Sequence, residues 1–319
     1  MWTLGGQQTS VTILTVTALA AGLAARAQPP STAPSRTQVV LLGTGTPPAD
    51  PDRSGPATAI VVNDTPYLVD MGAGVVRRAK SAVVDRGVAA LDPVKLRVVF
   101  VTHLHSDHTV GYPDLWLTPW VLGRRVPLEV YGPGGLGAMT EHLVAAHRDD
   151  FEARSRDRRL YTVGAFPEGH GVNAHEIRPG IVYTDANVRV TAFPTKHALE
   201  SYGYRFETAD RSIVISGDTN PTPATIDACR GCDVLIHEVL TQDWLAKRPD
   251  FVGYATQHHT TTAQLVELAA KARPRLLVLY HASLSLRPAV DAERSTPATL
   301  LREMAGYAGQ VVGRDLDVY

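Results

Sequence analysis

The sequence has very little cysteine, no excess of positive charge and only one long apolar run. Two of its 319 residues are cysteines, too few for a four-cysteine zinc knuckle. Lys and Arg number 31 against 32 Asp and Glu, so the positive excess of a non-specific nucleic-acid coat protein is absent. With 44% hydrophobic and 20% charged residues, the composition is that of a globular protein and excludes a disordered or collagen-like chain.

The apolar run near the N-terminus predicts export. Val11 to Leu23 is uncharged and has the length of a signal-peptide core, and Ala25-Arg26-Ala27 resembles a cleavage site. A membrane anchor is the alternative, but the run is short for a span of about 20 residues and prolines follow it. No Lys or Arg precedes the run, which is atypical of a signal peptide. We therefore expect a periplasmic or secreted protein without a stable membrane anchor, divided into a signal peptide at 1–27, a linker at 28–36 and one folded domain at 37–319.

The two cysteines, Cys229 and Cys232, are spaced Cys-x-x-Cys, and no thioredoxin-like context surrounds them. A local disulfide is one interpretation in an exported chain. The other is two small side chains at a junction between a helix and a strand, and we favour this second interpretation. The reactive chemistry is then expected elsewhere.

Short β-branched runs alternate with helical patterns along the chain, and no short-period repeat is visible. Strands are predicted at 37–43, 57–63, 66–71, 96–102, 127–131, 187–193, 202–207, 211–216, 233–237 and 275–280. Helices are predicted at 74–86, 107–122, 135–156, 222–230, 260–272 and 296–307. This order predicts two mixed sheets with helices outside, an α/β sandwich in one domain. Residues 153–186 are expected to form a long irregular excursion.

The strongest chemical signal is Thr102-His103-Leu104-His105-Ser106-Asp107-His108, directly after the predicted strand at 96–101. Three imidazoles and a carboxylate at a strand end are typical ligands of zinc and similar metals. The alternative is a surface histidine cluster, but a structural turn would gain nothing from four such groups and would lose free energy by burying their polar atoms. The segment therefore predicts a metal site.

Three further residues follow other predicted strands and could complete this site. His197 follows the strand at 188–193, Asp218 follows the strand at 212–215, and His281 ends the strand at 276–280. Each alone would have an ordinary structural explanation. Their shared position at strand ends favours a role as metal ligands.

Several motifs in this order resemble those of metallo-β-lactamase-fold hydrolases, and within them the ribonuclease Z branch, which includes zinc-dependent alkyl and aryl sulfatases. The resemblance covers about residues 38 to 283. The His-x-His-x-Asp-His motif is specific to the superfamily, and the His-Glu and His-Thr-Thr elements are more specific to this branch. The matching segments are Leu42-Gly43-Thr44-Gly45-Thr46-Pro47, Leu68-Val69-Asp70-Met71-Gly72, residues 103–108, Ser216-Gly217-Asp218-Thr219, His237-Glu238 and His259-Thr260-Thr261.

The resemblance implies an αββα four-layer sandwich with two Zn²⁺ ions, or another divalent metal, between two mixed sheets. Asp70 would orient a ligand by hydrogen bonding, unless it is only a turn carboxylate. The implied ligands are His103, His105 and His197 for one ion, Asp107, His108 and His281 for the other, and Asp218 for both.

The resemblance also implies catalytic roles. His259 would protonate the departing oxygen and Glu238 would orient His259, so that the predicted catalytic residues are His259, Glu238 and Asp107. The alternative for His259 is a histidine at a helix N-terminus beside His258. The other histidines are expected to pack, to form hydrogen bonds or to lie on the surface, namely His237, His258, His142, His147, His170 and His175.

The expected function is that of an exported dinuclear zinc hydrolase of small anionic esters, either sulfate esters or phosphodiesters. A hydroxide bridging the metals would be the nucleophile. A ribonuclease Z-like tRNA 3′ endonuclease, a lactonase and a non-catalytic metal-binding protein are the alternatives. A tRNA substrate is disfavoured by the predicted export and by the lack of a Gly/Pro-rich basic arm, because acidic residues dilute the Arg154 to Arg159 cluster. No DNA partner is expected, and a homodimer is left open.

Overall fold

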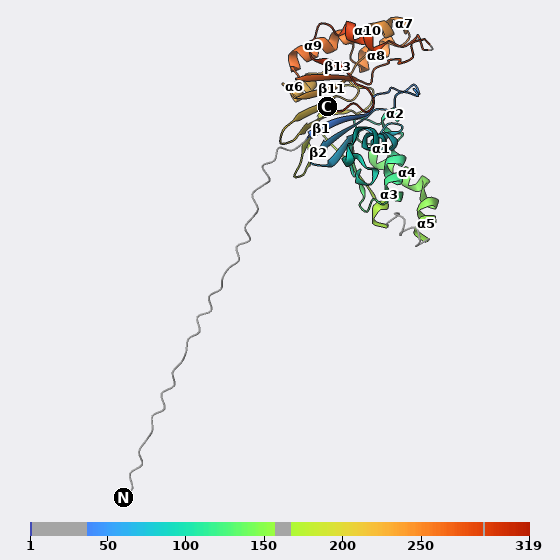
Figure 1. The fold of residues 1–319 in the computed structure, drawn as a ribbon, viewed down its shortest axis with the longest axis vertical. Coiled ribbons are helices and arrows are strands. Elements are labelled where there is room, and N and C mark those ends of the chain that lie inside the picture. Colours follow the sequence, from blue (N-terminus) through green and yellow to red (C-terminus); the bar gives the residue numbers. More distant parts are fainter. Residues whose placement is uncertain (2–36, 157–166, 290) are drawn as a thin grey trace. The chain divides into compact units, whose positions relative to one another are not determined.

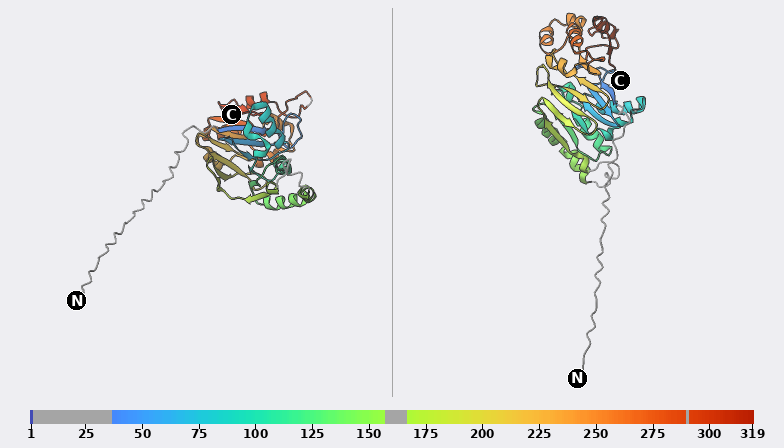
Figure 2. Two further views of the ribbon diagram at one scale, coloured as in Figure 1. Left: turned by 60° about the horizontal axis from the view of Figure 1, so that its bottom comes forward. Right: turned by 90° about the vertical axis from the view of Figure 1, so that its left-hand side faces the viewer.

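Two β-sheets stack face to face at the centre of the fold, and helices cover their outer faces (Figures 1 and 2). The computed structural model describes residue 1 and residues 37–156, 167–289 and 291–319. Apart from residue 1, the predicted signal peptide at 1–27 and linker at 28–36 lie outside the described residues. Residues 34–319 belong to one structural unit.

The first sheet has six strands in sequence order, with β1 at one edge and β6 at the other. Its first three strands are antiparallel, and β3 to β6 are parallel. The C-terminal end of the chain extends its edge, because the backbone of Tyr319 exchanges two hydrogen bonds of 2.9 Å with Val39 in β1. The strands are β1 (Thr37–Gly43), β2 (Ala57–Val62), β3 (Thr65–Val69), β4 (Val98–Phe100), β5 (Leu128–Gly132) and β6 (Val172–Glu176).

The second sheet has seven strands in the order β13-β12-β11-β10-β9-β8-β7. Strands β10 to β13 are parallel, whereas β7 to β10 alternate in direction. Strands β8, β10, β11 and β12 therefore run the same way, and their C-terminal ends meet at one edge. The strands are β7 (Gly180–Thr184), β8 (Arg189–Pro194), β9 (Tyr202–Glu207), β10 (Ser212–Ile215), β11 (Val234–Glu238), β12 (Leu276–Tyr280) and β13 (Gln310–Val312).

Helices from the two halves of the chain cover opposite outer faces. Those that pack on the first sheet are α1 (Val75–Arg86), α3 (Tyr112–Val121) and α4 (Leu136–Ala146), and α5 (Arg148–Arg156) follows α4. Those that pack on the second sheet are α6 (Pro223–Cys229), α9 (Thr262–Ala272) and α10 (Pro297–Glu303). Shorter helices are α2 (Ser106–Thr109), α7 (Gln242–Lys247) and α8 (Val252–His258), with 3₁₀ turns at Ala89–Leu91, Pro93–Lys95 and Pro167–His170.

The alternation of side chains along β1 explains this layering. Val39 and Leu41 lie in the apolar core between the two sheets, whereas Val40 and Leu42 lie in the core beneath α1 and α3. Successive side chains of a strand point to opposite faces, so a strand that is apolar at every position must be covered on both sides. The predicted αββα four-layer sandwich is thus confirmed.

All ten predicted strands are present, but the predicted excursion at 153–186 is partly wrong. It contains β6 and β7, whose half-buried residues alternate too weakly with polar ones to be recognised as strands. Residues 157–166 of the excursion lie outside the described part of the chain. The helices predicted at 107–122 and 135–156 are each two helices, α2 with α3 and α4 with α5. Strand β13 and helices α7 and α8 were not predicted.

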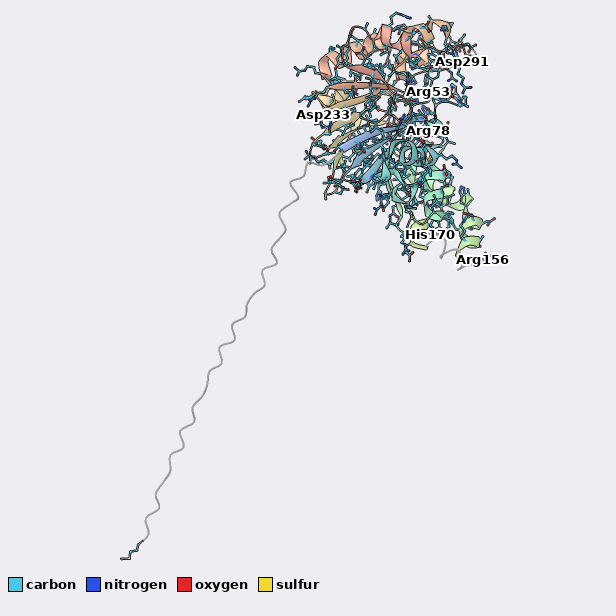
Figure 3. The ribbon with its side chains drawn as sticks, viewed as in Figure 1. Arg53, Arg78, Arg156, His170, Asp233 and Asp291 are labelled. Carbon is cyan, nitrogen blue, oxygen red and sulfur yellow. A yellow bond between two sulfur atoms is a disulfide. The ribbon has the colours of Figure 1, made fainter. Side chains whose placement is uncertain are left out.

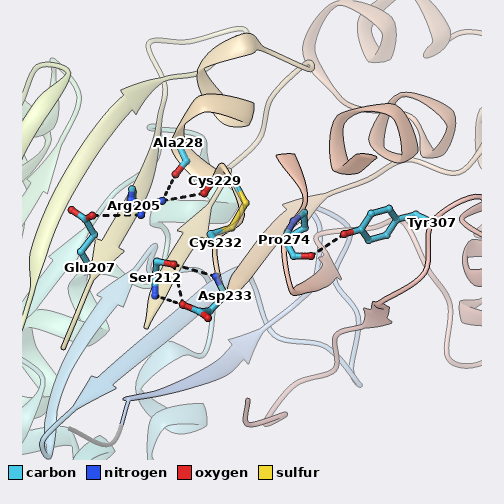
Figure 4. Close-up of a disulfide and its surroundings, with 9 residues drawn as sticks. All are labelled: Arg205, Glu207, Ser212, Ala228, Cys229, Cys232, Asp233, Pro274 and Tyr307. Carbon is cyan, nitrogen blue, oxygen red and sulfur yellow. Dashed lines mark hydrogen bonds and ion pairs between the residues drawn. A yellow bond between two sulfur atoms is a disulfide. The ribbon is translucent and has the colours of Figure 1, made fainter. Parts of the chain in front are cut away.

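The preference for free cysteines is also wrong. Cys229, at the end of α6, and Cys232, just before β11, form a disulfide (Figure 4). Both are buried, and the guanidinium of Arg205 on β9 donates to the carbonyl of Cys229 at 3.2 Å. The left-handed Arg230 and Gly231 between them return the chain tightly enough to bring the two sulfurs together, which the spacing alone did not reveal.

Candidate active site

The histidine-rich segment leaves the C-terminal end of β4 and enters α2. His103 and His105 precede this helix, and Asp107 and His108 lie in its first turn. Because a helix turn follows the strand end at once, the side chains of these four residues point in different directions around the candidate metal site. His103 and His108 are fully buried.

Asp70 holds this segment in place from the end of β3. Its Oδ1 accepts a hydrogen bond from the backbone N–H of Thr102 at 2.7 Å, and its Oδ2 accepts one from Thr102 Oγ1 at 2.9 Å. Oδ2 also lies 2.8 Å from Nδ1 of His108. Burial lowers the pKa of His108, but the negative charges of Asp70 and Asp218 outweigh it and raise this pKa well above its usual value. Asp70 thus makes the contacts that an orienting role requires.

His103, His105 and His197 form the first group of converging side chains. Nε2 of His103 lies 3.0 Å from Nδ1 of His105, and Nε2 of His197 lies 3.1 Å from the same atom. Nδ1 of His197 donates to the carbonyl of His258 at 3.0 Å, which fixes the ring. Burial lowers the pKa of all three histidines, so neutral imidazoles with free lone pairs, the form that binds metal, are favoured.

Asp107, His108 and His281 form the second group. Oδ2 of Asp107 lies 3.1 Å from Nε2 of His281 and 3.6 Å from Nε2 of His108. His281 directly follows β12 and has a left-handed backbone with φ of 44°. In each group the ligand atoms lie within 4.8 Å of one another.

Asp218 lies between the two groups, after the end of β10. Its Oδ1 is 3.3 Å from Nδ1 of His281 and 3.5 Å from Nε2 of His108, whereas its Oδ2 is 4.0 Å from Nε2 of His103. Burial raises the pKa of Asp218, but the positive charges of His281 and His108 outweigh burial and hold it well below its usual value. The ionised carboxylate therefore presents one oxygen to each group.

The side chains fit a divalent metal site. Within the described part of the chain, His108 Nε2 and Asp218 Oδ1 are buried polar atoms without a hydrogen-bond partner. Buried polar atoms are normally paired, and an unpaired one is costly. Imidazole nitrogens and carboxylate oxygens are the ligands that zinc prefers, so a metal ion would satisfy these atoms.

His259 and Glu238 form a hydrogen-bonded pair beside the candidate metal ligands. These seven ligands are together called the cage: His103, His105, Asp107, His108, His197, Asp218 and His281. Nδ1 of His259 donates to Oε1 of Glu238 at 3.2 Å, and the same oxygen accepts from the backbone of Thr260 at 3.0 Å and of Thr219 at 3.2 Å. Burial lowers the pKa of His259, but the charge and hydrogen bond of Glu238 outweigh it and raise the pKa to about 9. His259 therefore carries a proton at neutral pH. It also lies in a group with His197 and Asp218 whose ligand atoms are within 4.8 Å.

Arg53 was missed by the sequence analysis. Figure 3 places it in the middle of the domain, where the first half of the chain meets the second. It is buried and donates from Nη1 to the carbonyls of Ala282 at 2.8 Å and Leu284 at 3.2 Å, and from Nη2 to that of Thr44. These bonds fix the segment directly after His281, so Arg53 is placed to hold that ligand in its unusual backbone conformation.

Aromatic side chains beside the cage were also missed. A cavity of about 410 Å³ is lined by four of the candidate ligands, by His259 and by Trp244, Phe251 and Tyr254 from the region of α7 and α8. Phe251 and Tyr254 are three residues apart, which is the spacing of neighbours on one helical face. This spacing is the sequence feature from which an aromatic surface could have been predicted.

Of the remaining histidines, His237 packs and forms a hydrogen bond as expected, whereas His147 and His175, which were expected on the surface or in loops, are half-buried. His237 is buried in β11, where its Nδ1 donates to the carbonyl of Glu238 at 2.6 Å. His147 bonds the carbonyl of Leu143 at 2.9 Å, and the ring of His175 stacks on Tyr131 with centroids 4.4 Å apart. None of these histidines belongs to a described metal-ligand group.

The basic cluster beginning at Arg154 is largely neutralised where the structure describes it. Arg154 pairs with Asp150 at 2.9 Å and Arg156 with Glu152 at 2.5 Å, both as i, i+4 pairs on α5. Arg158 and Arg159 lie outside the described residues. Helix α5 and Arg156 are at the end of the domain opposite to α8 (Figures 1 and 3).

Known proteins resemble this chain in sequence and in fold. The family model of the β-lactamase superfamily domain matches residues 65–282. A ribonuclease Z of Mycobacterium sp. (strain KMS) is 34% identical over 82% of this chain and 90% of its own length. A ribonuclease Z of Mycobacterium bovis is 31% identical over 88% of this chain and 96% of its own. The crystal structure of human tRNase Z, short form, superposes with a TM-score of 0.63 and 21% identity, over 88% of this chain and 98% of the other.

These relatives correct two expectations. The expected function, an exported hydrolase of small sulfate or phosphate esters, is wrong, because the similarity over most of the chain is to ribonucleases Z. The expected periplasmic or secreted location is contradicted by the same relatives. A metal motif could not have separated these substrates, because sulfate esters and phosphodiesters are hydrolysed with the same ligands. Among the described residues, no helix is long and apolar enough to cross a membrane.

The family match covers β3 to β12 and therefore includes Asp70, the histidine-rich segment, Asp218 and His281. The fold and the relatives lead to the same assignment. The protein is a metal-dependent hydrolase of ester bonds, and the chain belongs to the β-lactamase superfamily, in its ribonuclease Z branch.

Proposed function

We propose that this protein is a ribonuclease Z-like endonuclease that removes 3′ extensions from tRNA precursors. The observation that carries the proposal is the 34% identity to a mycobacterial ribonuclease Z over 82% of the chain. The candidate site supports it, because four candidate metal ligands, His105, Asp107, Asp218 and His281, line one cavity together with His259. We assign this activity to the domain at 37–319.

The cage is proposed to hold two Zn²⁺ ions. His103, His105 and His197 would bind one, Asp107, His108 and His281 the other, and Asp218 both. Bound there, the ions supply Lewis acidity and lower the pKa of a coordinated water from about 15.7 to about 7. Asp107 and Asp218 contribute two negative charges, fewer than the four positive charges of two such ions, so the cage suits an anionic phosphodiester.

His259, assisted by Glu238, is proposed to donate a proton to the departing ribose oxygen. When water attacks phosphorus, the bond from phosphorus to the departing ribose oxygen breaks, and this oxygen needs a proton. His259 holds its Nδ1 against Glu238 at 3.2 Å, so its Nε2 is the edge available to donate that proton. Glu238 is fully buried and stabilises the positive charge of His259 before transfer.

A tRNA transcript with a 3′ extension is the direct test of the proposed substrate. Zinc-loaded protein should cut it once, at the 3′ end of the acceptor stem, and chelation should abolish the cut. The Asp218→Ala protein should be inactive, whereas His142→Ala, which removes an exposed histidine far along α4, should retain activity. An intact transcript, together with hydrolysis of aryl sulfates or lactones by the same preparation, would refute the proposal.

A further inference from the structure

We propose that the aromatic side chains Trp244, Phe251 and Tyr254, here called the aromatic wall, bind the nucleobase of the nucleoside that carries the leaving oxygen. This inference rests on the proposed phosphodiesterase function and adds a subsite to it. It assigns a substrate-binding role to residues that are neither candidate metal ligands nor candidate proton donors.

The aromatic wall and the candidate ligands line the same cavity. His105, Asp107, Asp218, His259 and His281 line this cavity together with the aromatic wall, Leu240 and Arg248. The cavity measures about 410 Å³, within the range of sites for small organic ligands of roughly 300–1,000 Å³. A phosphodiester at the cage would therefore have one of its two substituents against aromatic rings.

The three rings form a continuous surface. The centroids of Trp244 and Phe251 are 5.0 Å apart at 72°, and those of Phe251 and Tyr254 are 5.1 Å apart at 44°. The guanidinium carbon of Arg248 lies 5.8 Å from the centroid of Trp244 and adds a second planar group. Such surfaces bind nucleobases with little sequence preference, because every base has a π-face.

The aromatic wall lies beside His259, and therefore on the side of the cavity where the leaving nucleoside is expected. Tyr254 lies 5.7 Å from the ring of His259 and Phe251 lies 6.3 Å from it, measured between centroids. If His259 protonates the departing oxygen, the nucleoside attached to that oxygen must lie next to His259. Its base then meets Tyr254 and Phe251.

Packing in the hydrophobic core does not account for Tyr254. Leu240, Leu245 and Ala255 form a small buried cluster against which the partly buried Trp244 and Phe251 pack, and Tyr254 takes no part in it. The side chain of Tyr254 is 36% exposed, although it is large and aromatic. An exposed aromatic ring beside a catalytic cavity is available to a ligand.

RNA substrates with single abasic riboses test the inference. Wild-type protein should lose about 5- to 150-fold in kcat/KM when the base on the leaving side is absent, the range expected for one stacked base. Removal of the base on the other side of the scissile bond should have a much smaller effect. Tyr254→Ala should lose activity on the intact RNA but show little further loss on the leaving-side abasic RNA, whereas Tyr254→Phe should behave as wild type.

Two results would overturn the inference: indifference of the wild type to the leaving-side base, or an equal fold loss by Tyr254→Ala on both RNAs. Metal content and melting temperature of Tyr254→Ala, expected to match wild type, exclude a folding defect as the cause of any loss.

A binding measurement separates failure of this inference from failure of the proposed function. Adenosine 3′-monophosphate, which carries its phosphate on the oxygen that departs when a tRNA 3′-hydroxyl is released, should quench the tryptophan fluorescence of a Trp2→Phe protein. A further Trp244→Phe substitution should abolish this change, because the two other tryptophans, Trp116 and Trp120, are buried elsewhere. Quenching without any RNA cleavage would refute the proposed function and support the aromatic wall. RNA cleavage without quenching and without dependence on the base would refute the wall and support the function.

Discussion

Asp218 is a buried carboxylate whose two oxygens face different groups of candidate metal ligands. Replacing it by Ala should remove a ligand from both metal positions, so the metal content should fall from about two ions per chain to below one. His259→Ala should keep its metal, because His259 is proposed to bind none. Elemental analysis of the purified variants measures this difference.

Comparing the metal contents of Asp218→Ala and His259→Ala also tests whether His259 is itself a metal ligand. His259 lies close enough to His197 and Asp218 to be a ligand. Equal metal loss from Asp218→Ala and His259→Ala would show that His259 binds metal and would remove its assignment as the acid. His142→Ala serves as the matched control and should retain all of its metal.

His259 should control the dependence of the rate on pH and on the leaving group. Its pKa, raised to about 9 by Glu238, keeps it protonated at neutral pH, and the protonated form is the active acid. Activity on substrates with poor leaving groups should therefore be highest between the pKa of about 7 of the coordinated water and the pKa of about 9 of His259, and should be lost as the pH rises through about 9. Nitrophenyl esters should not show this loss, since a stable phenolate needs little proton donation.

The His259→Ala variant completes this test. It should lose about 100-fold or more on a poor leaving group and distinctly less on an activated one. A uniform loss over both substrates, with metal content unchanged, would instead assign His259 to substrate positioning or charge stabilisation.

Among the individual site residues, the sequence predicted those that occur in short motifs. The three histidines and one aspartate of residues 103–108 are recognisable because they are adjacent in the chain, and the structure brings His197, Asp218 and His281 to them. Arg53 could not be found in this way. Its role depends on carbonyls more than 200 residues away, and any residue can supply a carbonyl.

Between α6 and β11, the disulfide of Cys229 and Cys232 closes a very short loop. By the loop-entropy account, such a crosslink stabilises the folded state by about 2 kcal/mol. The Cys229→Ala/Cys232→Ala double variant should therefore melt a few degrees lower than the wild type. Reduction with tris(2-carboxyethyl)phosphine, which unlike a dithiol is not a strong zinc chelator, should lower the melting temperature of the wild type similarly and leave the double variant unchanged. No effect of either treatment would show that the disulfide contributes nothing to stability.

Elements were predictable where apolar residues were strongly patterned. The strands that form both cores are apolar at nearly every position and all were found, because burial on both faces leaves a continuous signal. β6, β7 and β13 were missed, and each is an edge strand. β6 and β7 have exposed residues, β6 reading Val-Asn-Ala-His-Glu, and β13 has only three residues. Helices α7 and α8 are one or two turns long and carry little helical periodicity.

The whole molecule is organised so that both halves of the chain build the site. The first sheet contributes the histidine-rich segment after β4, and the second contributes His197, Asp218 and His281 after β8, β10 and β12. A backbone hydrogen bond of 2.9 Å from Tyr202 to Thr102 joins the sheets beside the cage. The sequence could predict this shared edge, but not the substrate, because a metal cage of this composition serves several anionic esters.

Anomalous diffraction at the zinc edge from crystals of the purified protein tests the two-metal centre most directly. The account predicts two peaks, one among His103, His105 and His197 and the other among Asp107, His108 and His281, with Asp218 in contact with both. A single peak, or two peaks of which one lies outside these residues, would contradict it. Absence of any metal from the cage, with the imidazoles still bonded to one another as His103 and His105 are at 3.0 Å, would contradict it as well.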